Sequence, residues 1–152
     1  MAFSVPKLFI FAAVLACAFV ANAGPLSRRQ VGNAQCNIDR LKFVVNLQET
    51  SDQINKLATE LANTNFSSTV DSAQSGIDGA FQATDGIADA IFSNQTAPPE
   101  LRNQVGGNLT IVLKALLSIN TTDPTASATL ENAKSFFQTA AEASNDVVED
   151  CH

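Results

Sequence analysis

Few residues in this sequence have side chains that could carry out chemistry. The sole histidine, His152, ends the sequence, so neither a Ser-His-Asp nor a Cys-His catalytic arrangement is easily built, and a metal site of several histidines is impossible. Asp85 and Asp89 are four residues apart, a spacing that would let two helical carboxylates share a cation. No calcium-loop pattern surrounds them, so a solvated acidic face is the better interpretation. The sequence predicts no enzyme, no metal and no cofactor.

The cysteines favour a structural interpretation. Cys17 lies in an N-terminal apolar run, which leaves Cys36 and Cys151 near the two ends of the remaining chain. In an oxidising compartment such a pair is expected to form one disulfide, and nucleophilic chemistry is the less favoured alternative. The disulfide would require the two ends of the domain to lie together.

The N-terminal residues predict export. Lys7 precedes an unbroken apolar run over residues 8–21, and a small-residue cleavage site ends at Ala23, so residues 1–23 are expected to be a secretory signal peptide. The run is shorter than the roughly 20 residues that span a bilayer. Residues 24–29 end in Arg28 and Arg29 and are interpreted as a pro-segment with a dibasic processing site. An uncut N-terminal tail is the alternative.

Processing after Arg29 would leave residues 30–152 as a single domain in a secreted, extracellular or wall-associated protein. This segment keeps six of the nine Lys and Arg residues and all 15 Asp and Glu residues, which gives a formal charge of −9. A nucleic-acid partner is therefore not expected. No second long apolar run follows the leader, so the mature chain is expected to have no transmembrane segment.

Four amphipathic helices must position these residues. In each of four stretches, apolar or small residues recur at spacings of three and four, which keeps them on one helical face. Asp-Gly pairs at 78–79 and 85–86 offer turns as an alternative, and Gly106-Gly107 offers a split with Asn108 as N-cap. The stretches cover residues 37–63, 66–91, 101–119 and 126–151.

The number of helices predicts the fold. Short loops between long helices favour antiparallel packing, and an even number of helices returns the chain to the end where it began. Cys36 and Cys151 then meet. The expected fold is all-α: an up-down-up-down four-helix bundle closed by one terminal disulfide.

The sequence also carries four N-glycosylation sequons, and glycosylation is expected where these fall in loops. Three of them coincide with breaks between the predicted helices. The acceptor residues are Asn65, Asn94, Asn108 and Asn120.

The first predicted helix is apolar nearly all round in its N-terminal half. Unless residues 30–35 or a neighbouring helix cover it, this half forms an exposed contact patch. Alternatively, the bundle opens and lays its inner faces on an interface, helped by polar residues such as Thr50 and Thr84 on those faces. The simpler interpretation of these two threonines is that each stays buried and donates a hydrogen bond to a preceding backbone carbonyl. The candidate patch consists of Ile38, Leu41, Phe43, Val44 and Val45.

Three short motifs of this sequence resemble those of small secreted proteins from mushroom-forming fungi. They are Arg28-Arg29-Gln30, Gly32-Asn33-Ala34-Gln35-Cys36-Asn37 and Asp146-Val147-Val148-Glu149-Asp150-Cys151. More distantly, the helical, Ala/Ser/Thr-rich pattern is similar to the fungal hydrophobic surface binding protein A family. This resemblance implies a noncatalytic secreted protein that binds hydrophobic surfaces, cell-wall material or lipid. It transfers no site residue. The alternative function is a secreted effector or inhibitor that docks to a host or competitor protein through a helical face.

Overall fold

The structure is a computed structural model that describes residues 34–151. The expected signal peptide and pro-segment, with Ala23, Arg28 and Arg29, lie outside the described residues, as does His152.

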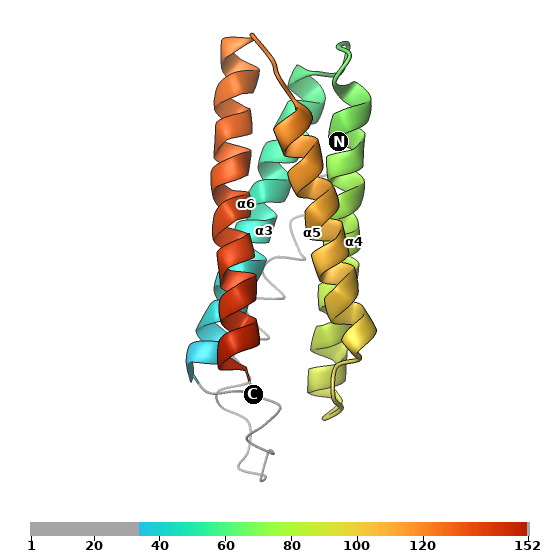
Figure 1. Ribbon diagram of the computed structural model, residues 1–152, viewed down its shortest axis with the longest axis vertical. Helices are drawn as coiled ribbons and strands as arrows, with labels where there is room; N and C mark the ends of the chain where they lie inside the picture. The colour runs from blue at the N-terminus through green and yellow to red at the C-terminus, as the bar shows by residue number, and fades with distance from the viewer. Residues whose placement is uncertain (1–33, 152) are drawn as a thin grey trace, which may run out of the picture.

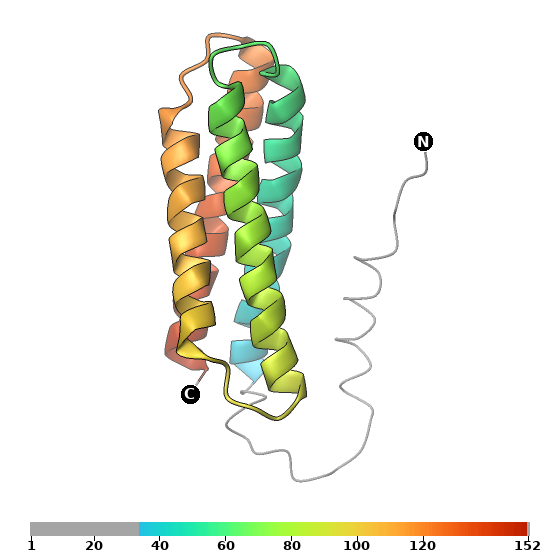
Figure 2. The ribbon, with the colours of Figure 1, turned by 90° about the vertical axis from the view of Figure 1, so that its right-hand side faces the viewer.

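Four long antiparallel helices make up the described residues, and Figures 1 and 2 show them running up, down, up and down along one axis. Cys36 and Cys151 form a disulfide, with an S–S distance of 1.98 Å and a Cα–Cα distance of 5.1 Å. The predicted four-helix bundle with its terminal disulfide is therefore confirmed. The helices are α3 (Ala34–Glu60), α4 (Ser67–Phe92), α5 (Pro99–Ser118) and α6 (Pro124–Asp150).

The helix ends follow ordinary capping chemistry. Helix α5 begins with Pro99 and carries Glu100 in its first turn. Proline is tolerated at this position because the backbone N–H that it lacks would have no partner within the helix, and the negative charge of Glu100 interacts favourably with the positive end of the helix dipole. Asp123 caps α6 by accepting a hydrogen bond from the Ala126 amide at 2.8 Å. Both α4 and α5 continue through their glycines, so the alternatives of turns at the Asp-Gly pairs and of a split at Gly106-Gly107 are wrong.

The helices are packed as two close pairs. Helix α3 contacts α6 along its length and α4 contacts α5 in the same way, whereas contacts between the pairs are sparse. Small residues permit the close approach within pairs: Ala126, Ala133 and Ala140 of α6 are fully buried. A Cβ added to Gly76 of α4 would lie 2.8 Å from a methyl carbon of Val112 on α5. These are the α3/α6 pair and the α4/α5 pair.

The core lies between the two pairs. Threonines that face inward satisfy their hydroxyls locally: Thr50 and Thr84 each donate to the carbonyl four residues earlier, at 2.7 Å, which confirms the simpler interpretation of these residues. The largest apolar side chains that are fully buried are Leu47, Ile54, Leu57, Leu61, Val70, Ile77, Val112 and Leu116.

The connections divide between the two ends of the bundle. The disulfide and the α4–α5 loop (93–98) lie at one end, which we call the disulfide end. Residues 61–66 and 119–123 connect one helix pair to the other, and both segments lie at the opposite end, as Figure 2 shows. Within residues 34–151, the two pairs are thus covalently joined at one end only.

Candidate functional site

A strip of apolar residues on α3 faces away from the bundle. Ile38, Leu41 and Val45 are each 48% exposed, and their spacing of three and four places them on one side of the helix. We call these three residues the α3 strip. Phe43 is buried and Val44 packs against the core, so these two belong to the inner face and not to an outer contact surface.

Two further exposed apolar residues lie at the disulfide end. Phe92 ends α4 and is 64% exposed, and Val148 near the end of α6 is 72% exposed. The spacing of apolar and small residues in 126–151 predicts Val148 on the inner face with Phe137 and Ala140, which are buried. Its exposure shows that the end of α6 lacks a covering neighbour, in agreement with the sparse contacts between α5 and α6.

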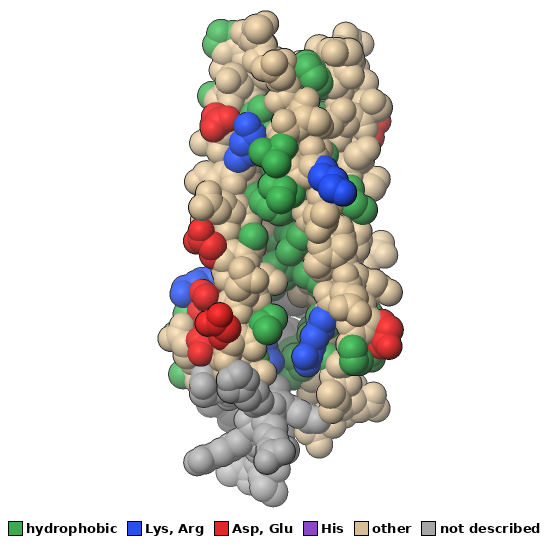
Figure 3. Space-filling model, in the orientation of Figure 1, with side chains coloured by type: hydrophobic (Ala, Val, Ile, Leu, Met, Phe, Trp, Pro, Cys, Tyr) green, Lys and Arg blue, Asp and Glu red, His purple; other side chains and the backbone are tan. Residues whose placement is uncertain are grey.

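The interface between α5 and α6, which we call the α5/α6 seam, is open on one face of the molecule. Figure 3 shows apolar side chains gathered along this seam, and the surface there is hollowed in the half nearer the disulfide. The Arg40 guanidinium on α3 and the Arg102 guanidinium on α5 lie near each other at this end. Burial lowers the pKa of Arg40, and the charge of Arg102 lowers it further.

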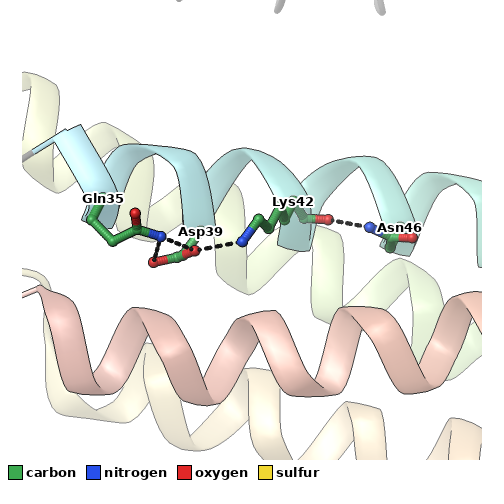
Figure 4. Close-up of polar contacts among 4 residues, drawn as sticks. All are labelled: Gln35, Asp39, Lys42 and Asn46. Carbon is green, nitrogen blue, oxygen red and sulfur yellow. Dashed lines mark hydrogen bonds and ion pairs between the residues drawn. The ribbon is translucent and has the colours of Figure 1, made fainter.

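A buried carboxylate lies beside the disulfide. Asp39 accepts hydrogen bonds from Gln35 Nε2 at 2.9 and 3.1 Å and from Lys42 Nζ at 3.1 Å, and Figure 4 shows these side chains along the edge of α3. Burial alone would raise the pKa of Asp39, but the hydrogen bonds from Gln35 and Lys42 and the positive charge of Lys42 outweigh it and hold the pKa below its ordinary value. All three bonds are made within the first turns of α3, where they satisfy a carboxylate that is fully buried.

The depressed pKa of Asp39 predicts a pH dependence of stability. An acid whose pKa is lowered by folding stabilises the protein above its unfolded pKa, and this stabilisation is lost as the pH falls through the folded value. We therefore expect Asp39→Asn to lower the melting temperature at pH 7 and to flatten its decline below about pH 4. Thermal unfolding from pH 2 to 7 measures both effects.

Asp52→Asn provides the control for that experiment, because Asp52 also accepts a bond from a glutamine four residues earlier, Gln48, but is exposed. This variant is expected to leave the melting temperature at pH 7 within about 2 °C of the wild type. Parallel pH curves for wild type and Asp39→Asn would contradict the assigned role of Asp39.

The other candidate chemical groups are spread apart. Asp85 and Asp89 are both exposed, and within residues 34–151 no three His, Cys, Asp or Glu side chains lie close enough together to hold a metal ion. A shallow, open hollow between α4 and α5 contains one titratable group, Lys114, among hydroxyl and apolar side chains. Its other lining residues are Ser68, Thr69, Ser72, Ile111, Ala115 and Ser118.

The sequons differ in their surroundings. Asn65, Asn94 and Asn120 are exposed in the loops, where a glycan could extend into solvent. Asn108 lies within α5 instead, and its amide donates to the Gln104 carbonyl at 2.8 Å. The same side chain packs against Gly79 of α4.

Comparison with known proteins adds no functional residue. No family model, curated protein or solved structure matches this sequence. Among the helices of residues 34–151, none is long and apolar enough to cross a membrane. Function is therefore inferred from the surface and packing of the bundle itself.

Proposed function

We propose that this protein is a secreted, noncatalytic protein that binds hydrophobic surfaces, such as wall material, lipid or a polyester, through the disulfide end of its bundle. The observation that carries the proposal is the α3 strip, an outward row of apolar side chains with no helix of the bundle over it. Grouped apolar residues on the surface of a protein mark contact sites. Phe92 and Val148 extend the apolar character of the same end. The resemblance to the hydrophobic surface binding protein A family supports this function.

The size of the α3 strip sets the strength of the first contact. Full burial of an Ile, Leu or Val side chain contributes about 1.5–3 kcal/mol, and about half of each strip residue is already covered. The strip therefore contributes about 3 kcal/mol, which is comparable to or smaller than the entropy lost on immobilisation, about 4–15 kcal/mol. Contact through the strip alone is weak and reversible.

Replacing Leu41 with lysine tests the proposal. Lysine removes apolar area from the middle of the strip and places a charge at the contact, so we expect the amount retained on alkane or polyester beads after washing to fall about tenfold. The measurement is the fraction of folded protein retained, with folding checked by circular dichroism.

Leu117→Lys is the matched control, because Leu117 is 65% exposed but lies in the second half of α5, at the opposite end of the bundle. The control is expected to bind like the wild type. Equal retention of wild type and Leu41→Lys would contradict the role of the strip. If the wild type itself is not retained, and host or competitor extracts yield a specific protein partner instead, the effector function is favoured.

A further inference from the structure

The covalent connections allow the two helix pairs to separate at one end. The disulfide lies within the α3/α6 pair, and the 93–98 loop lies within the α4/α5 pair. The only connections between the pairs in the described chain are residues 61–66 and 119–123, both at the end opposite the disulfide. Separation at the disulfide end therefore breaks no covalent bond and leaves the close contacts within each pair intact.

Few noncovalent contacts join the pairs, and the surface of the disulfide end is consistent with its opening. The pairs contact each other sparsely, the α5/α6 seam is hollowed in the half nearer the disulfide, and Val148 is exposed on what would be an inner face. Arg40 and Arg102 bring like charges near each other from opposite helix pairs, and like charges resist close approach. They are the two arginines of residues 30–152, in a segment that is otherwise strongly acidic.

We propose that the two helix pairs hinge apart at the disulfide end, about residues 61–66 and 119–123, and lay their inner apolar faces on an apolar–water interface. This inference rests on the proposed function. It identifies the inner faces of the helices as the part of the protein that stays bound after the first, weak contact through the α3 strip. The partner of the opened bundle is an extended apolar surface, because opening exposes two long apolar inner faces with far more apolar area than the α3 strip. These faces carry Phe43, Leu47 and Phe137 on one pair and Ile77, Val105 and Leu109 on the other.

A cross-link between the pairs tests the inference. Arg40 of α3 and Arg102 of α5 lie near each other at the disulfide end, so Arg40→Cys with Arg102→Cys, joined by a bis-maleimide, ties one pair to the other at the end that is expected to open. The native cysteines are held in their disulfide and do not react. We expect the cross-linked protein to be retained on alkane beads at least tenfold less than the same variant without the cross-linker.

The matched control is a cross-link within one pair. Thr129 of α6 donates to Glu60 of α3 at 3.0 Å, so Glu60→Cys with Thr129→Cys ties two helices that are expected to stay together. This cross-link should leave retention unchanged. Both cross-links use two introduced cysteines and the same reagent, but only the first joins the two helix pairs.

A charge reversal at the open end supplies a second measurement. Arg102→Glu places an acid near Arg40 and should hold the pairs closed, so we expect the initial rate of adsorption to fall about fivefold. Lys114→Glu changes the net charge equally on the α4/α5 surface away from the seam and should change the rate less than twofold.

The outcomes separate the two proposals. If the wild type adsorbs and the inter-pair cross-link has no effect, the hinge is overturned while surface binding stands. If the wild type does not adsorb, the proposed function fails first. Loss of retention with both cross-links would overturn the inference, because it would show that motion within a pair is needed.

Discussion

Reduction of the Cys36–Cys151 disulfide is expected to lower the free energy of unfolding by about 5 kcal/mol. The bond closes a loop of 115 residues, and on the chain-entropy account a loop of this length restricts the unfolded chain by about that amount. Since small domains are stable by about 5–15 kcal/mol in total, the reduced protein should unfold at a much lower urea concentration. Urea unfolding with and without reductant measures the difference.

The double variant Cys36→Ser with Cys151→Ser controls for effects of the reductant. Its urea midpoint should be insensitive to reductant and should lie near that of the reduced wild type. A reduced wild type that unfolds at the same urea concentration as the oxidised protein would contradict a stabilising role for the disulfide. Loss of the bond is also expected to free the start of α3, which carries Asp39, from the end of α6.

Gly76→Leu is expected to destabilise the bundle by about 3 kcal/mol, because the new side chain has no space between α4 and α5. Even a Cβ at this position would lie 2.8 Å from Val112 and 3.1 Å from the backbone oxygen of Asn108, and the backbone oxygen cannot move aside without shifting α5. Overpacking of this kind typically costs about 1–3 kcal/mol or somewhat more. Urea unfolding again provides the measurement.

Gly107→Leu is the opposite case on the neighbouring helix. Beyond its own stretch of helix, no heavy atom lies within 4 Å of a Cβ added at Gly107, so leucine there gains helix propensity without a clash and should stabilise the protein by about 0.5–1 kcal/mol. The two variants make the same chemical change with opposite expected signs. Equal effects at both positions would contradict the close approach of α4 and α5.

The fold was predictable because two independent patterns agree. The spacing of apolar residues predicts four helices, and the positions of Cys36 and Cys151 require the two ends of the domain to meet. The glycines of α4 did not break the helix, because α5 packs against Gly76 and Gly79 where a turn would have moved them away. Tertiary packing thus overrode a local preference for turns.

The arrangement of the helices into pairs was not predictable from periodicity. A stripe indicates which face of a helix points inward but not how far away the neighbouring helix lies, so Val148 was assigned to a covered face that the structure leaves exposed. For the same reason the proximity of Arg40 to Arg102 had no signal in the sequence, since these residues lie on helices that are not adjacent in the chain.

The Asp39 cluster did have a signal that the sequence analysis missed. Gln35 and Lys42 are four residues before and three residues after Asp39, the spacings at which helical side chains meet. The unexpected part is the burial of Asp39, because helical spacing does not show which residues will cover a side chain. Phe43, by contrast, continues the stripe of Leu47 and Ile54 at spacings of four and seven, so the sequence does indicate that it lies on the inner face and not in the contact patch.

The most direct test of surface binding by an opening bundle is the area per molecule at a saturated alkane–water interface. We predict that the wild-type protein adsorbs and occupies about twice the area of the protein cross-linked between Arg40→Cys and Arg102→Cys, because both inner faces lie flat on the interface. No adsorption of the wild type, or the same area per molecule for the free and cross-linked proteins, would contradict the account.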